Sequence, residues 1–176
     1  MSEFEKARKH FTEAILKTWT VAGGAVKVEP VTESTGGEDY TSRKTGPLFA
    51  FQANGPKGIM RGFAGADGTV ALAKTLGPLF KAAGVPKAPT LSAKDLAHRV
   101  RWVLHPGFTE LTGAGFPMLP PDENPEMRLE SQGSGAVLTF FAQQGGQTGT
   151  VVVYKVQARV DAAYAFSSTS IYMVPQ

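Results

Sequence analysis

The chain contains no cysteine, and this absence excludes several classes of structure and chemistry. A disulfide framework, a Cys-ligated zinc or iron–sulfur site and a thiol nucleophile all require that residue. Long hydrophobic runs are absent too, since the apolar stretches are only a few residues long and a bilayer span needs about 20. Residues 1–10 are charged and lack the apolar core of an export signal. We therefore expect a cytoplasmic protein with no membrane segment.

A concentrated basic run is also missing, although the formal net charge is +3. Residues 1–105 carry 15 Lys/Arg and 9 Asp/Glu, whereas residues 106–176 carry 3 and 6. The basic residues of the first part are scattered, and several stand close to acids in the sequence. Nucleic-acid-binding surfaces usually combine a basic stripe with aromatic residues. The sequence therefore does not favour a nucleic-acid partner.

The composition is that of a globular protein. Hydrophobic residues make up 42% of the 176 residues and charged residues 19%. A chain of this length buries roughly 70% of its unfolded surface, so it needs neither a disulfide nor a metal to fold. We expect residues 1–176 to form a single domain.

Two helices are predicted from capping signals and apolar periodicity. Ser2 and Glu5 have the spacing of a capping box, and apolar residues then recur at steps of three and four up to Ala22. The second helix is expected from Ser92, its N-cap, to Leu104, before the Pro106-Gly107 stop. Its core stripe comprises Leu96, Val100, Val103 and Leu104.

The strand signals predict an antiparallel sheet. A short edge strand is expected at 25–31 and a hairpin at 48–64, after a polar loop at 32–47. Residues 127–174 predict a meander of about four strands, in which even positions from 150 to 160 form an apolar face. The expected fold class is therefore α+β: an antiparallel sheet, built from the meander, hairpin and edge strand, packed against two or three helices. The strand order stays open.

One face of the second helix is the first candidate site. His98, Arg101, Trp102 and His105 follow each other at helical spacing, which predicts a recognition patch with an aromatic ring, a cation and titratable donors. Alternatively, Trp102 packs under the loop that follows the helix, and both histidines remain half exposed. The two histidines are separated by about 10 Å of helix, too far to bind one metal ion. We therefore expect no metal ion at this pair, and we expect no other metal site and no cofactor.

The connection at 106–125 is the second candidate. This segment contains five prolines and shows no strong periodicity, and long structureless connections often form binding surfaces. Its large apolar residues must cover the core, line a pocket or meet a partner. The predicted binding residues are thus His98, Arg101, Trp102, His105, Phe108, Phe116 and Met118.

Two function classes remain open. A non-catalytic binding or interaction domain is favoured, because the chain has no catalytic motif and has the size of small bacterial adaptors, chaperones and immunity proteins. Its partner would be a protein or a small apolar ligand, and a homodimer is a further option. The alternative is a cofactor-free isomerase, lyase or hydrolase with a cavity between sheet and helices. In that case His105, Glu110 and Asp122 would supply acid–base catalysis.

Overall fold

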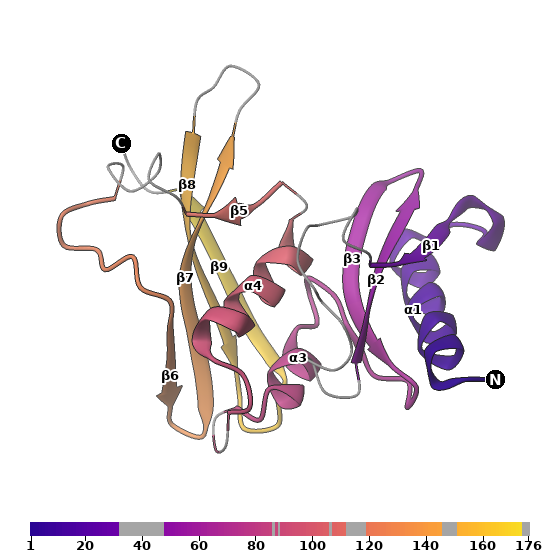
Figure 1. Ribbon diagram of the computed structural model, residues 1–176, viewed down its shortest axis with the longest axis horizontal. Helices are drawn as coiled ribbons and strands as arrows, with labels where there is room; N and C mark the ends of the chain where they lie inside the picture. The colour runs from indigo at the N-terminus through magenta and orange to yellow at the C-terminus, as the bar shows by residue number, and fades with distance from the viewer. Residues whose placement is uncertain are drawn as a thin grey trace.

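The computed structural model describes residues 1–31, 48–85, 87, 89–105, 107–111, 119–145 and 151–173, with the backbone alone for 166–173. The expected polar loop at 32–47, Phe116 and Met118 lie outside these residues. The described elements form an α+β structure with two antiparallel sheets, which confirms the predicted fold class (Figure 1).

Helix α1 (Glu3–Trp19) begins at the predicted capping box. The Ser2 side chain accepts a hydrogen bond from the Glu5 N–H at 3.2 Å, and the Glu5 carboxylate accepts one from the Ser2 N–H at 2.8 Å. Phe11 and Trp19 belong to its buried face, and the Phe11 ring stacks on Phe51 with centroids 5.3 Å apart. Each fully buried aromatic side chain of this kind contributes about 1.5–3 kcal/mol.

The N-terminal sheet has the order β1-β2-β3-β4. Strand β1 (Lys27–Pro30) forms the predicted edge, and β2 (Leu48–Gly55) and β3 (Gly58–Gly65) form the predicted hairpin. Gly62 allows α1 to approach β3 closely, because a Cβ there would lie 2.9 Å from the Phe11 ring. The short strand β4 (Val70–Ala71) completes the sheet.

Two helices follow β4. Helix α3 (Gly77–Ala82) carries Pro78 in its first turn, where the missing N–H costs no hydrogen bond. Helix α4 (Ala93–Leu104) starts at the predicted N-cap, since the Ser92 hydroxyl accepts from the Asp95 N–H at 3.0 Å. Both helices lie between the two sheets, and α1 covers the far side of the N-terminal sheet (Figure 1).

The C-terminal sheet contains β5 (Thr109–Glu110), β6 (Arg128–Gln132), β7 (Gly135–Gly145), β8 (Val151–Val160) and β9 (Phe166–Met173). Its order is β5-β7-β8-β9, and β6 pairs with β7 beside β5. The strand β5 is a correction to the sequence analysis. Residues 106–125 were expected to lack structure, but Thr109 and Glu110 pair with Gln143 and Ala142.

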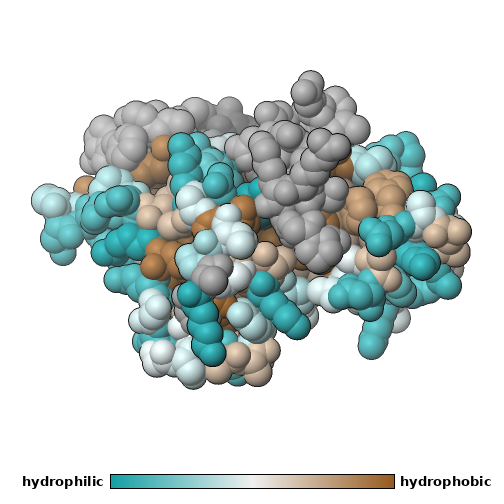
Figure 2. All heavy atoms as spheres, turned by 60° about the horizontal axis from the view of Figure 1, so that its bottom comes forward, coloured by the Kyte–Doolittle hydropathy of each residue, from teal (hydrophilic) through white to brown (hydrophobic). Residues whose placement is uncertain are grey.

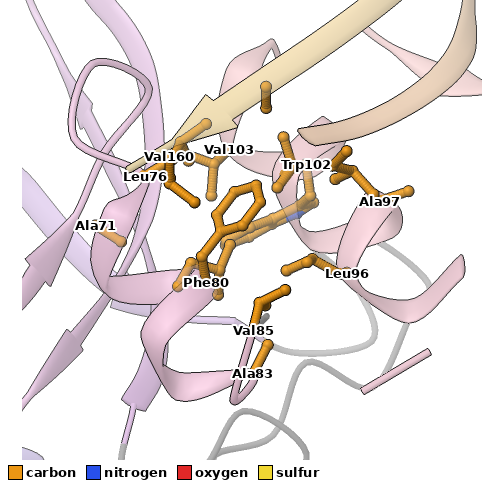
Figure 3. Packing of buried hydrophobic residues seen from close by; sticks show 14 of the residues in the cluster. Ala71, Leu76, Phe80, Ala83, Val85, Leu96, Ala97, Trp102, Val103 and Val160 are labelled. Carbon is orange, nitrogen blue, oxygen red and sulfur yellow. The ribbon is translucent and has the colours of Figure 1, made fainter. Parts of the chain in front are cut away.

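The main core fills the space between the sheets. It combines residues of β3, α3, α4, β7 and β8, including the predicted apolar face of β8 at Val156, Ala158 and Val160. Figure 3 shows Phe80 at its centre, with Leu76 and Val103 close by. The helices therefore hold both sheets together, because each sheet buries one face against them.

The surface mixes polar and apolar residues. Hydrophilic side chains lie over much of the face shown in Figure 2, and hydrophobic ones are visible between them near its centre. In the described part of the chain, no helix has both the length and the apolar character of a membrane span.

Candidate functional site

Trp102 lies in the core rather than on an accessible face. Its side chain is 4% exposed, and its ring meets Phe63 of β3 edge to face at 5.4 Å between centroids. The Arg61 guanidinium lies 5.3 Å from the centre of the same ring. This burial corrects the expectation that Trp102 offers an aromatic platform to a ligand. The indole instead joins α4 to the N-terminal sheet, because Phe63 and Arg61 both belong to β3.

His98 lies between two other predicted site residues. Its Nδ1 is 2.9 Å from Arg101 Nη2, and its Nε2 is 3.7 Å from Glu110 Oε2 on β5. Arg101 has only donors, so Nδ1 accepts and the ring hydrogen of the neutral imidazole lies on Nε2, which faces Glu110. The structure thus brings His98 close to both Arg101 and Glu110, although Glu110 follows His98 by 12 residues and lies beyond the end of α4.

The chemistry of this cluster favours positioning over proton transfer. Arg101 is 7% exposed, whereas the Glu110 side chain is 42% exposed. A general base must reach the proton that it removes, and both ring nitrogens of His98 already face protein groups. The accessible end of the cluster is therefore the Glu110 carboxylate, which lies 3.7 Å from His98 Nε2.

An aromatic column stands beside the cluster. The rings of His105 and Phe108 lie 5.1 Å apart, and those of Phe108 and Tyr154 lie 5.2 Å apart. His105 is the exposed C-cap residue of α4, and its Nδ1 accepts a hydrogen bond from the Gly107 N–H at 2.9 Å. Tyr154 comes from β8 and is half-buried. Sequence reasoning assigned it only to the apolar face of a strand, because its link to Phe108 exists only in the tertiary structure.

The acids expected to act together lie on different faces of the C-terminal sheet. Glu110 pairs with Ala142, which belongs to the face packed on the helices. Glu123 instead contacts Lys155 at 2.7 Å, on the opposite face. Asp122 is Glu123's neighbour in an exposed turn and makes no hydrogen bond or ion pair with another described residue. The structure therefore does not support the convergence of His105, Glu110 and Asp122 on one site.

Part of the 106–125 connection covers apolar surface. Leu111 packs in a small cluster with Phe141 and Val153 on the outer face of the C-terminal sheet, and Leu119 lies against the same cluster. The Lys155 ammonium lies 5.9 Å from the Phe141 ring centre. Covering apolar surface was one of the roles expected for this segment. Leu111 and Leu119, on either side of residues 112–118, have this role.

Two of the surface hollows that described residues line lie away from this cluster. One, of about 280 Å³, opens on the outer face of the C-terminal sheet and is lined by Glu130, Ser131, Gln132, Val137, Gln157 and Arg159. The other, of about 300 Å³, lies on α1 and is lined by Glu5, Arg8, Lys9, Thr12 and Glu13. Over the described ranges, no group of three or more His, Asp or Glu residues has the arrangement of a metal site.

The aromatic column and the cluster around His98 are therefore the candidate site. Its residues come from α4, from the start of the 106–125 connection and from β8. The chain matches no protein-family model, no curated protein and no solved structure, so the function has to be inferred from these residues themselves.

Proposed function

We propose that this protein is a non-catalytic interaction domain whose contact surface, here called the α4-end surface, comprises His105, Phe108, Tyr154 and Glu110. The observation that carries the proposal is the aromatic column of the first three residues. Aromatic side chains are the usual anchors of protein interfaces, because they bury a large area at a low cost in conformational entropy.

Three separate parts of the fold hold the rings of the aromatic column in place. Its three rings belong to the end of α4, the following connection and the central part of β8, so ordering them on binding costs little. His105 at the outer end is exposed, whereas Phe108 and Tyr154 are half-buried. A partner that covers His105 would therefore extend an apolar surface that the fold already holds in place.

The adjacent carboxylate suggests the chemistry of the partner. The Glu110 side chain is 42% exposed and lies 3.7 Å from His98 of α4. A carboxylate next to aromatic rings suits a protein segment with an apolar or aromatic residue and a Lys or Arg next to it. The rings would contact the apolar part, and Glu110 would pair with the cation at the rim.

Site-specific photo-crosslinking tests this proposal in the natural host. The photoreactive residue benzoylphenylalanine replaces Phe108, and a matched variant carries it at Ile59, an apolar residue of β3 that is 47% exposed. We expect one defined crosslinked protein from position 108 and none of the same mass from position 59. The combination with Glu110→Lys should reduce that product severalfold, because it reverses the rim charge. The same products from both positions, or none from position 108, would contradict the proposal.

A further inference from the structure

Strand β9 lies at the edge of the C-terminal sheet (yellow in Figure 1). Among the described residues, β8 is its only hydrogen-bonded neighbour, in an antiparallel register that runs from Tyr154↔Met173 to Val160↔Phe166. An edge strand presents a row of backbone N–H and C=O groups that another strand can pair with. Proteins usually protect such edges with charges, proline, bulges or very short strands.

The other outer strands carry these protections. Strand β1 at the edge of the N-terminal sheet contains Lys27, Glu29 and Pro30. Strands β4 and β5 have two residues each, and β6 carries Arg128 and Glu130. Edge pairing by any of them would therefore be short or would place charges at the new contact.

The sequence of strand β9 contains none of the residues that usually protect an edge strand. Its eight residues, Phe-Ser-Ser-Thr-Ser-Ile-Tyr-Met, include no Lys, Arg, Asp, Glu, Pro or Gly. The irregularity in its pairing lies at Arg159 and Val160, so residues 168–173 stay in regular register. This leaves a regular, uncharged edge of six residues, long enough to pair with another strand.

We infer that β9 pairs antiparallel with β9 of a second copy of this chain, so that the two C-terminal sheets become one continuous sheet. A two-fold axis at Thr169 places Ser168 of one copy opposite Ser170 of the other, and Ser167 opposite Ile171. None of these positions is charged, so the symmetric pairing brings no like charges together. A foreign strand would find no charged position in β9 by which to be selected.

This contact is separate from the α4-end surface. It uses the outer backbone edge of β9, whereas the aromatic column reaches the C-terminal sheet at Tyr154, in the neighbouring strand. One strand pair buries a small area, so we expect a dimer that dissociates on dilution. Dimerisation through β9 therefore does not depend on the α4-end surface, and either can exist without the other.

A charge-swap experiment tests the pairing. The variant S168K/S170K places Lys opposite Lys at two positions of the symmetric contact, and S168E/S170E places Glu opposite Glu. Sedimentation velocity over a concentration series should show a monomer–dimer equilibrium for the unaltered chain. Each charged variant should stay monomeric where the unaltered chain is half dimeric, and an equimolar mixture of the two should recover the dimer.

Two controls keep the experiment decisive. The variant S131K/S134K adds the same charge at two exposed serines in and after β6, and it should dimerise like the unaltered chain. Circular dichroism should show that all variants remain folded. Recovery of the dimer in the mixture shows by itself that each charged variant is folded at β9. An unaltered chain that stays monomeric at the highest soluble concentration overturns the inference. A dimer that persists in both charged variants, or a mixture that stays monomeric, overturns it too.

Discussion

The Lys155 ammonium donates to both carboxylate oxygens of Glu123, at 2.7 and 3.0 Å, across 32 positions of sequence. The two side chains are only 15% and 25% exposed. This ion pair attaches the chain that precedes β6 to the outer face of the C-terminal sheet, beside the cluster of Leu111, Phe141 and Val153. The end of the 106–125 connection is therefore fixed by charge as well as by apolar contact.

Replacing Lys155 should destabilise the protein more than replacing an exposed partner of an ion pair. We expect Lys155→Ala to lower the free energy of unfolding by about 1–2 kcal/mol, between the values for exposed and buried pairs. Lys9→Ala is the matched control, because Lys9 and Glu13 lie 3.9 Å apart and are 62% and 59% exposed. Its effect should stay within about 0.5 kcal/mol. Urea denaturation measures both, and equal losses would show that the Glu123 contact adds no stability.

The burial of Trp102 predicts a large loss of stability on truncation. Trp102→Ala should cost about 3–5 kcal/mol, because it removes a buried ring between α4 and β3 and leaves a cavity. Phe108→Ala, at a half-buried position, should cost about 1 kcal/mol. Chemical denaturation distinguishes the two. A Trp102→Ala variant as stable as Phe108→Ala would contradict the placement of this indole in the core.

Gly77 is predicted to be intolerant of any side chain. A Cβ at this position would lie 1.7 Å from the Tyr164 carbonyl oxygen, at the start of α3. Backbone on both sides has to move, so Gly77→Ala should destabilise the protein by about 1–3 kcal/mol. Gly24→Ala is the control, since a Cβ there meets no atom within 4 Å. If both variants melt at the same temperature, the start of α3 does not pack closely on the Tyr164 backbone.

Asp67 should make stability depend on pH in the acid range. The Thr69 N–H and hydroxyl donate to its carboxylate at 3.0 and 2.9 Å, which lowers the pKa of Asp67 below its ordinary value of 3.8. A lowered pKa in the folded state contributes stability that is complete above pH 3.8 and is lost as the pH falls through the folded-state value.

Asp67→Asn should therefore be less stable than the unaltered chain at pH 6, and the difference should shrink at pH 2.5. Thr69→Ala removes only the hydroxyl donor, so its loss at pH 6 should be smaller than that of Asp67→Asn. Urea midpoints at several pH values measure both effects. A difference between the chain and Asp67→Asn that stays constant from pH 6 to pH 2.5 would contradict the assigned cause.

The helix starts could be predicted from the sequence because their determinants are local. The pairs Ser2/Glu5 and Ser92/Asp95 are three residues apart, and each hydroxyl accepts the expected backbone hydrogen bond. The β2–β3 hairpin depends likewise on a turn between two neighbouring apolar runs. Such interactions involve residues that are close in the chain, so they need no knowledge of the remaining fold.

The candidate site could be predicted only in part. His98, Arg101 and Trp102 are neighbours on one helix, yet His98 lies near Glu110 of β5 while Trp102 packs on β3. Helical spacing cannot decide which side of α4 each sheet will cover. Tyr154 was missed for the same reason, since its contact with Phe108 spans much of the C-terminal half of the chain.

The sequence by itself determined the α+β class, both long helices, the hairpin and the alternation that buries one face of β8, because periodicity and capping depend on neighbours in the chain. The tertiary structure decided that the strands form two sheets with α3 and α4 between them. It also decided that Glu110 and Glu123 reach opposite faces of the C-terminal sheet. These outcomes depend on which apolar faces pack together, and that choice is made by contacts between residues far apart in sequence.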